Sequence, residues 1–235
     1  MAPLTLIVIP TFNESDNIRR VVAAVRAALP LAEVLVVDDA SPDGTAAVVR
    51  EIAQRDPALH LLQRSAKLGL GSAYVAAFGW GLSRGFERFL QMDADFSHAP
   101  DCLPAFVAAL DAGADVVVGS RNVAGGKVVG WGPVRYSLSK GGSLYSRLIL
   151  SAVVRDMTSG FKAYSRAALE RIDLGQIRSN GYAFQIETTF RALRAGLRVV
   201  ELPIVFVDRR AGKSKMSKSD VWEAVWAPWK MRRVR

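Results

Sequence analysis

Cysteine and histidine are scarce in this chain, and their scarcity excludes several kinds of site. Cys102 is the only cysteine in 235 residues, which rules out an intrachain disulfide framework and zinc spacing based on cysteine. There are two histidines, His60 and His98. No convincing histidine or cysteine nucleophile is present, and the low cysteine content fits a reduced compartment.

Long hydrophobic runs are also missing. The longest comparable segment, 148–154, is interrupted by Ser151 and bounded by Arg147 and Arg155. It is far shorter than the roughly 20 residues of a membrane-spanning helix. The first residues, 1–3, lead directly into a strand-like run, so no signal peptide is expected. The chain is expected not to cross a membrane, although it can lie on one.

Acidic residues are outnumbered. Against 31 lysines and arginines stand 22 aspartates and glutamates, which gives a net charge of +9. This surplus favours an anionic partner, whether nucleic acid, a phosphorylated substrate or an anionic lipid surface. Half of the residues are apolar, enough for one sizeable core.

Short apolar runs alternate with helical patterns through the first half. We predict strands at 4–9, 34–37, 59–62, 86–92 and 115–118, and helices at 15–29, 45–55, 71–82 and 103–110. This alternation predicts an α/β fold with a mainly parallel, Rossmann-like sheet and helices on both faces. Ligands of such sheets bind at the carboxyl ends of the strands.

The second half has a different pattern. The residues 125–126 and 130–133 predict a loop. Helical spacing predicts an amphipathic helix at 137–154 and further helices at 182–195 and 221–231. A strand-like run at 199–207 contains Pro203, which indicates an edge strand or a bulge.

Two acidic pairs follow predicted strands. Asp93 and Asp95, with Ala94 between them, can face one divalent cation and leave open positions for phosphate oxygens. Asp38 and Asp39 can bind ribose hydroxyls, a base or a metal. A phospho-acceptor receiver domain would need a further acid after the third strand, where Leu62-Gln63-Arg64 stands.

Several other motifs each allow two interpretations. The segment 10–14 offers an aromatic ring and a carboxylate to a nucleoside, or a helix cap by Asn13 or Ser15. The segment 67–74 is an anion cradle at a helix start or a loop that permits close packing. His98 is a ligand or base, or a structural hydrogen-bonding residue.

The basic segment 209–218 folds over phosphates, or is only solvated charge. It contains Lys-Met-Ser-Lys-Ser (215–219), a signature of class I aminoacyl-tRNA synthetases, but the early His-x-Gly-His-type motif of those enzymes is missing. Near the end of the chain, Trp222, Trp226 and Trp229 form a helical stripe followed by arginines. This stripe favours docking at a membrane interface over core packing.

Together these blocks resemble the inverting GT-A glycosyltransferases, and among them the dolichol-phosphate (polyprenyl-monophosphate) mannose synthases. The resemblance covers residues 6–219 and rests on the blocks at 10–14, 37–45, 68–74, 92–98, 119–121, 156–161, 181–187, 207–209 and 214–215. The Ser-Pro-Asp-Gly-Thr, Gly-Leu-Gly-x-Ala-Tyr and Gly-Tyr-x-Phe-Gln blocks carry most of its specificity.

The resemblance implies a single GT-A domain over 1–235 that transfers mannose from GDP-mannose to a polyprenyl or dolichyl phosphate with Mg²⁺ or Mn²⁺. Residues 1–121 would bind the nucleotide sugar, and 122–235 would face the acceptor and the membrane. Asp95 and Arg121 would be catalytic; Asp93, Asp95 and Ser97 would hold the metal; Arg135 and Ser139 would bind the acceptor phosphate. The nucleotide-sugar ligands would be Pro10, Phe12, Glu14, Val37, Asp39, Asp93, Ala94, Asp95, Arg121, Arg209 and Lys215.

The sequence departs from the family pattern at three points. Phe12 stands where a tyrosine is usual, and Ser97 stands where some members have glutamine. Many members continue into transmembrane helices. We therefore expect a cytoplasmic protein, peripheral on the inner face of an anionic membrane, anchored by its C-terminal amphipathic helices, a membrane-spanning partner or a fused domain.

Two alternatives remain at this point. A polyprenyl-phosphate glucose or other hexose synthase would share the fold and the metal site. A non-catalytic nucleotide- or RNA-binding module would use the same sheet and basic surface, although no nucleic-acid partner is expected from the resemblance.

Overall fold

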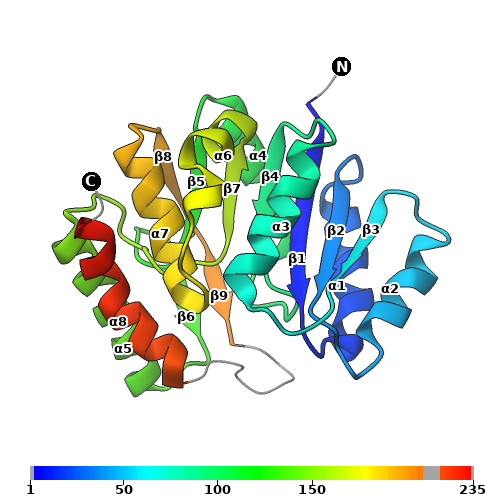
Figure 1. The fold of residues 1–235 in the computed structure, drawn as a ribbon, viewed down its shortest axis with the longest axis horizontal. Coiled ribbons are helices and arrows are strands. Elements are labelled where there is room, and N and C mark those ends of the chain that lie inside the picture. The colour runs from blue at the N-terminus through cyan, green and yellow to red at the C-terminus, as the bar shows by residue number, and fades with distance from the viewer. Residues whose placement is uncertain (1–2, 209–217, 234–235) are drawn as a thin grey trace.

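The computed structural model describes residues 3–208 and 218–233 (Figure 1). Its seven-stranded sheet has the order β3-β2-β1-β4-β7-β5-β8, and a two-stranded sheet pairs β6 with β9. The strands are β1 (Thr5–Thr11), β2 (Glu33–Asp38), β3 (Leu59–Gln63), β4 (Arg88–Gln91), β5 (Val116–Ser120), β6 (Lys127–Val129), β7 (Lys162–Ser165), β8 (Val199–Pro203) and β9 (Val205–Val207). The helices are α1 (Ser15–Ala28), α2 (Thr45–Ala53), α3 (Leu70–Leu82), α4 (Leu103–Asp111), α5 (Pro133–Leu150), α6 (Arg166–Ile172), α7 (Gly181–Arg194) and α8 (Lys218–Arg233), with short 3₁₀ turns at Pro100–Cys102 and Leu174–Gln176.

The large sheet is mainly parallel, as the alternation of strands and helices predicts. Strand β1 lies parallel to both β2 and β4, β2 is parallel to β3, and β5 is parallel to β8. Strand β7 runs antiparallel between β4 and β5. Because β7 and β8 come from the second half of the chain, both halves contribute to one sheet.

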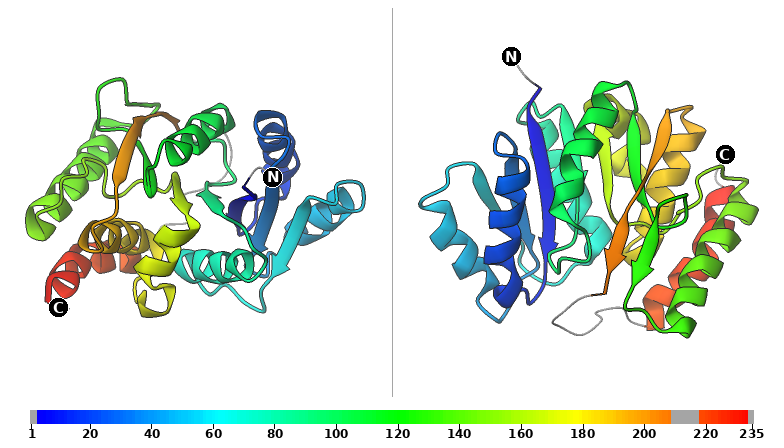
Figure 2. Two further views of the ribbon diagram at one scale, coloured as in Figure 1. Left: turned by 90° about the horizontal axis from the view of Figure 1, so that it is seen from above. Right: turned by 180° about the vertical axis from the view of Figure 1, so that it is seen from behind.

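Helices cover both faces of the sheet (Figure 2). Apolar side chains of α1, α2 and α4 pack with the sheet in one cluster, and those of α3, α6 and α7 pack in a second. Helix α1 shows the cause, because Ile18, Val21, Val22 and Val25 recur at helical spacing and are all buried.

A third apolar cluster lies at the end of the molecule opposite β3, where α5 and α8 lie side by side (Figures 1 and 2). The side chains of Ile149, Ile186 and Met231 bring together α5, α7 and α8. The Tyr145 hydroxyl also donates to the backbone oxygen of Val225 at 2.8 Å. The helix pair is thus attached to the rest of the molecule through α7.

Several predicted boundaries were wrong. The helix predicted at 137–154 begins at Pro133, because proline fits the first turn of a helix, and ends before Ser151, whose φ is 52°. The run at 199–207 forms two strands, since Pro203 ends β8; β8 does lie at the sheet edge. The strand predicted at 86–92 covers only Arg88–Gln91.

Three short elements were not predicted. Strand β6 occupies part of the segment predicted to be loop between the glycines at 125–126 and 130–133. Strand β7 and helix α6 follow each other without an intervening loop residue. Both β6 and β7 are too short to show a clear period in the sequence.

Candidate active site

A cavity of about 1530 Å³ opens at the carboxyl ends of β1, β4 and β5 and extends along α5. It gathers most of the residues that the sequence predicted for the site. Those that line it are Pro10, Phe12, Glu14, Asp39, Asp93, Ala94, Asp95, Arg121, Arg135 and Ser139. The structure therefore brings the predicted donor and acceptor residues into one space.

Four predicted residues are not placed in this lining. Val37 is buried in the core, where its carbonyl oxygen accepts a hydrogen bond from the Thr11 hydroxyl at 3.3 Å. Ser97 is buried behind Asp95. Arg209 and Lys215 lie outside the described residues.

The acidic motif leaves β4 in a tight turn. Phe96 adopts a left-handed conformation with φ of 59°, and Oδ1 of Asp95 accepts hydrogen bonds from Ser97 N at 3.0 Å and Ser97 Oγ at 2.6 Å. The Ser97 hydroxyl thus orients the carboxylate of Asp95. The side chain of Asp93 is 39% exposed.

His98 is a structural residue. Its Nδ1 accepts a hydrogen bond from Asp93 N at 3.1 Å, and its ring stacks on Phe161 with centroids 4.9 Å apart. Burial lowers the pKa of His98 below its usual 6.5, and the negative charges of Asp93 and Asp95 oppose this only in part. The ring thus positions the acidic turn; its Nδ1 lone pair is taken by the Asp93 amide, and burial disfavours the imidazolium that a base would have to become.

The carboxylates fit a hard divalent cation. Among residues 3–208 and 218–233, no three acidic, histidine or cysteine side chains gather into a complete cage. Asp93 and Asp95 would thus supply a few oxygen ligands and leave the other positions to substrate oxygens, as Mg²⁺ and Mn²⁺ sites for phosphates do.

The second acidic pair serves two different purposes. Asp38 is fully buried and accepts hydrogen bonds from the Thr11 hydroxyl and from Ser41. Asp39 lines the cavity and forms an ion pair with Arg64.

The carboxylate of Asp39 also fixes the loop that precedes α3. It accepts hydrogen bonds from the backbone amides of Leu68 and Gly69, at 3.1 and 3.2 Å. These amides are occupied by an internal carboxylate, which supports the interpretation of 67–74 as a closely packed loop. Lys67 from this loop lies over the ring of Phe12, with Nζ 4.4 Å from the centroid.

The start of α1 is capped from a distant turn. Asp43 accepts a hydrogen bond from Ser15 N at 3.0 Å, and the Thr45 hydroxyl accepts one from Glu14 N at 3.0 Å. Burial tends to raise the pKa of Asp43, but hydrogen bonds from Thr45 and Ser15 outweigh it and lower the pKa to about 2. The predicted cap by Asn13 or Ser15 is therefore wrong: no side chain at the start of α1 caps it, and Asp43 and Thr45 accept from its first backbone amides instead.

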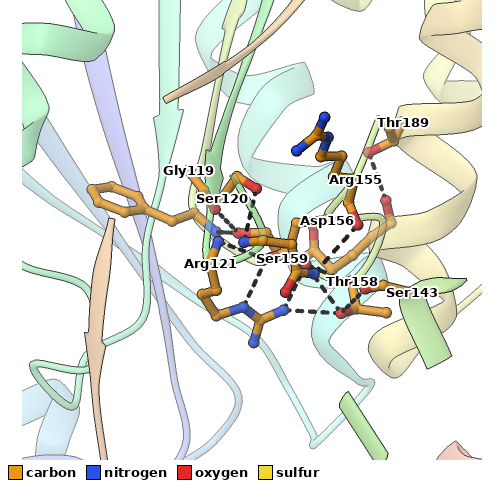
Figure 3. Close-up of polar contacts among 12 residues, drawn as sticks. Gly119, Ser120, Arg121, Ser143, Arg155, Asp156, Thr158, Ser159 and Thr189 are labelled. Atoms are coloured by element: carbon orange, nitrogen blue, oxygen red, sulfur yellow. Dashed lines mark hydrogen bonds and ion pairs between the residues drawn. The ribbon is translucent and has the colours of Figure 1, made fainter. Parts of the chain in front are cut away.

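Arg121 is held by a buried carboxylate that the sequence analysis left without a role (Figure 3). Asp156 accepts hydrogen bonds from the backbone N, Nε and Nη2 of Arg121, at 2.9, 2.8 and 2.7 Å. The Thr158 hydroxyl accepts another from Nη2 at 2.9 Å. Within the described parts of the chain, Nη1 of Arg121 has no acceptor and is available to a ligand in the cavity.

Trp131 connects the predicted donor and acceptor sides. The guanidinium carbon of Arg135 lies 4.3 Å from the centroid of the Trp131 ring, and that of Arg121 lies 5.7 Å from it. Arg135 also forms an ion pair with Asp208 at 2.8 Å. Two guanidinium groups thus lie near one aromatic ring. No motif in the sequence predicted this role for Trp131.

An exposed apolar face adjoins the cavity on α5 and α8. The exposed fractions are 72% for Val134, 71% for Leu138, 70% for Leu148 and 56% for Trp226. Val134 and Leu138 also line the cavity. Trp229 donates from Nε1 to the Tyr145 hydroxyl at 2.9 Å, and the side chain of Trp222 lies outside the described residues. None of the helices within 3–208 and 218–233 has the length and hydropathy of a membrane span.

The same architecture occurs in solved glycosyltransferases. The structure of glucosyl-3-phosphoglycerate synthase from Mycobacterium tuberculosis with Mn²⁺, UDP-glucose and phosphoglyceric acid has a TM-score of 0.72 at 18% identity, and the match covers 100% of this chain and 81% of that one. The structure of the same enzyme with phosphoglyceric acid alone also gives a TM-score of 0.72, at 19% identity, with the same coverage. This likeness confirms the predicted GT-A fold.

Sequence relatives identify the family. The family model described as glycosyl transferase family 2 matches residues 6–173. The polyprenol monophosphomannose synthase of Mycolicibacterium smegmatis is 48% identical over 97% of this chain and 87% of its own length. The undecaprenyl-phosphate mannosyltransferase of Micrococcus luteus is 49% identical over 94% of this chain and 90% of its own length.

These relatives, the family match and the fold agree on an enzyme, which decides against the non-catalytic binding module. The chain belongs to glycosyl transferase family 2 and, within it, to the polyprenyl-phosphate mannose synthases.

Proposed function

We propose that this enzyme transfers mannose from GDP-mannose to a polyprenyl phosphate, with Mg²⁺ or Mn²⁺, as a peripheral protein on the cytoplasmic face of a membrane. The observation that carries the proposal is the continuity of the cavity. It runs from the carboxylates of Asp93 and Asp95, past Arg121 and Arg135, to the apolar face of α5. A sugar nucleotide needs the charged part of this cavity and a lipid phosphate needs an adjoining apolar surface, so the transfer requires both side by side.

The donor half of the proposal rests on charge and position. Pro10, Phe12, Glu14 and Asp39 line the end of the cavity at β1 and β2, where a nucleoside fits. Asp93 and Asp95 would hold the metal, with Ser97 as the residue that positions Asp95. A bound divalent cation would neutralise the diphosphate and make it a better leaving group. Nη1 of Arg121 would stabilise the same developing charge.

The acceptor half rests on the cations and the apolar face. Arg135 and Ser139 from α5 line the cavity and would bind the lipid phosphate. Arg135 lies over the ring of Trp131, which lines the same cavity. The prenyl chain would pass along Leu138 and out over α5 and α8.

The chemistry needs no strong base. A phosphate monoester has a second pKa of about 6 and is mostly dianionic at neutral pH. One of its oxygens would attack the anomeric carbon in line, the bond from that carbon to the diphosphate would break, and GDP would leave with inversion of the sugar. This agrees with the burial of His98, which lowers the pKa of its ring and disfavours its taking up a proton.

An assay with radiolabelled GDP-mannose, a polyprenyl phosphate and Mg²⁺ or Mn²⁺ tests the activity directly. We expect lipid-linked mannose from the wild type, and a loss of about 1000-fold or more from Asp95→Ala. Asp101→Ala is the matched control, since Asp101 is a nearby exposed acid outside the cavity lining. Transfer from UDP-glucose but not from GDP-mannose would support the alternative hexose synthase. Near-normal turnover by folded Asp95→Ala would contradict the metal assignment.

A further inference from the structure

Gln185 lies in the cavity wall without a role in the steps above. It sits in the second turn of α7, its side chain is 2% exposed, and it lines the cavity. Its backbone oxygen accepts hydrogen bonds from Lys162 Nζ at 2.6 Å and from the Thr189 hydroxyl at 3.0 Å. The backbone of Gln185 is therefore fixed, and its side chain is a buried polar group.

A chain of hydrogen bonds fixes which way its amide points. The carbonyl oxygen of Gly160 can only accept, so the group of Gln91 that faces it at 2.9 Å must be the amide nitrogen. That nitrogen also donates to Oε1 of Gln185 at 2.8 Å. The oxygen of Gln185 is thus turned toward Gln91, and its Nε2 is left as a donor on the other side.

The absence of a side chain at Gly160 leaves a gap beside this donor. A methyl group at this position would stand 3.6 Å from Gln185 Nε2, 3.5 Å from His98 Cε1 and 4.0 Å from Asp93 Oδ1. Gly160, His98 and Asp93 all line the cavity. The gap therefore has an amide donor on one side and a carboxylate acceptor on the other.

A hydroxyl group matches this pair of neighbours. It can accept from the amide of Gln185 and donate to the carboxylate of Asp93 at the same time. A phosphate oxygen only accepts, so it could pair with the amide of Gln185 but could not donate to the carboxylate of Asp93, which it would meet only through a bound cation. We propose that Gln185 binds a hydroxyl group of the donor hexose and thereby selects the sugar, an inference that rests on the proposed transfer from a nucleotide hexose.

Deoxy analogues of the donor test this contact. The value of kcat/KM is measured for GDP-mannose and for its 2-, 3-, 4- and 6-deoxy forms, with the wild type and with Gln185→Glu. The glutamate keeps the acceptor for Gln91 but lacks the donor. In the wild type, we expect kcat/KM for one deoxy form to be lower than that for GDP-mannose by about 30-fold or more. In Gln185→Glu, the same ratio should fall to about threefold or less.

Gly160→Ala is an independent probe. The added methyl would make only ordinary contacts and Gly160 needs no left-handed backbone, so the fold should be retained. It would fill the hexose gap but not the nucleoside end. We expect GDP affinity, measured by calorimetry with Mn²⁺, to stay within about twofold, while mannose transfer falls by about tenfold or more.

The possible failures are separable. For each deoxy donor, the ratio of kcat/KM for GDP-mannose to kcat/KM for that donor is compared between the wild type and Gln185→Glu. If none of these ratios changes, Gln185 does not contact a hydroxyl and the inference is wrong. If the wild type uses another nucleotide hexose instead of GDP-mannose, the proposed donor is wrong, and the deoxy series of that hexose tests Gln185 in the same way. If the wild type transfers no hexose, both are wrong.

Discussion

The contact between Arg121 and Asp156 shows how one buried carboxylate controls a residue of the site. Burial alone would raise the pKa of Asp156, but hydrogen bonds and the charge of Arg121 outweigh it and hold the pKa below 3.8. The side chains of both residues are almost fully buried, at 9% and 0% exposure. Removing one charge of such a pair leaves the other without compensation.

We therefore expect Asp156→Asn to lower both stability and activity. The free energy of unfolding should fall by about 3–5 kcal/mol, as for other buried pairs that lose one partner. Urea unfolding and the mannose-transfer assay measure the two effects. Glu51→Gln is the control, because it breaks the exposed pair with Arg19 and should leave both values close to wild type. Wild-type stability in Asp156→Asn would contradict the assigned role of the pair.

Lys162 gives a prediction about pH. Burial lowers its pKa from 10.5 to about 7, and the negative charge of Asp156 opposes this only in part. Between these two pKa values the unfolded chain carries a proton on Lys162 that the folded chain does not, so stability rises with pH.

Lys162→Met removes this dependence. We expect the stability of the wild type relative to Lys162→Met to increase between about pH 7 and pH 10, because the penalty of the buried charge is fully present below pH 7. Unfolding by urea at pH 7 and pH 9.5 measures the difference. An unchanged difference between the two proteins at both pH values would show that Lys162 stays charged when buried.

At the scale of elements, the pair α5 and α8 presents a face that nothing in the described chain covers. Leu148 and Trp226 are 70% and 56% exposed on neighbouring helices (Figure 1). Basic residues Lys230, Arg232 and Arg233 lie in the last turn of α8. Apolar side chains with adjacent cations are suited to the interface of an anionic membrane.

The sequence-level expectation of membrane docking can be tested on these helices. We expect the wild type to bind vesicles that contain anionic lipid, less strongly at high salt, and Leu148→Ser or Trp226→Ser to bind about tenfold more weakly. Leu31→Ser is a matched control, because Leu31 is 92% exposed but lies in the α1–β2 connection, far from α5. Vesicle flotation without binding at any ionic strength would remove the docking proposal.

The elements that could be predicted from the sequence are those with a clear hydrophobic pattern within the segment itself. Strands β1, β2 and β5 are continuous buried apolar runs, and α1 repeats its buried positions every three to four residues. Strand β7 could not be found in this way. It begins with Lys162, a charged residue whose burial depends on a hydrogen bond to the distant helix α7. The roles of Asp156 and Gln185 likewise depend on partners far away in the chain.

The candidate site was predictable to the extent that it stands at strand ends. Asp93 and Arg121 follow β4 and β5, so the fold class alone places them on one edge of the sheet. Val37 and Ser97 follow the same rule but point into the protein. The direction of a side chain within a turn depends on local hydrogen bonds, such as that from Ser97 to Asp95, which the motif does not specify.

At the scale of the molecule, the chain carries a net charge of +9, and the proposed reaction would bring two anionic substrates to one site. The carboxylates of Asp93 and Asp95 oppose this attraction, so donor binding should depend on a divalent cation that screens them. We expect GDP at 100 times its dissociation constant, with Mn²⁺, to stabilise the folded chain by about 2.7 kcal/mol. For a protein of this size that is a rise in Tm of about 5–10 °C.

Chelation by EDTA should remove most of this rise, because the diphosphate would then face two uncompensated carboxylates. Thermal unfolding of the wild type and Asp95→Ala, each with GDP alone, Mn²⁺ alone and both together, separates the contributions. Asp95→Ala should show little additional shift when Mn²⁺ accompanies GDP, whereas Asp101→Ala should behave as the wild type does. An equal shift in all three proteins with EDTA present would mean that the nucleotide binds without a cation, and that the two acids at the end of β4 have another purpose.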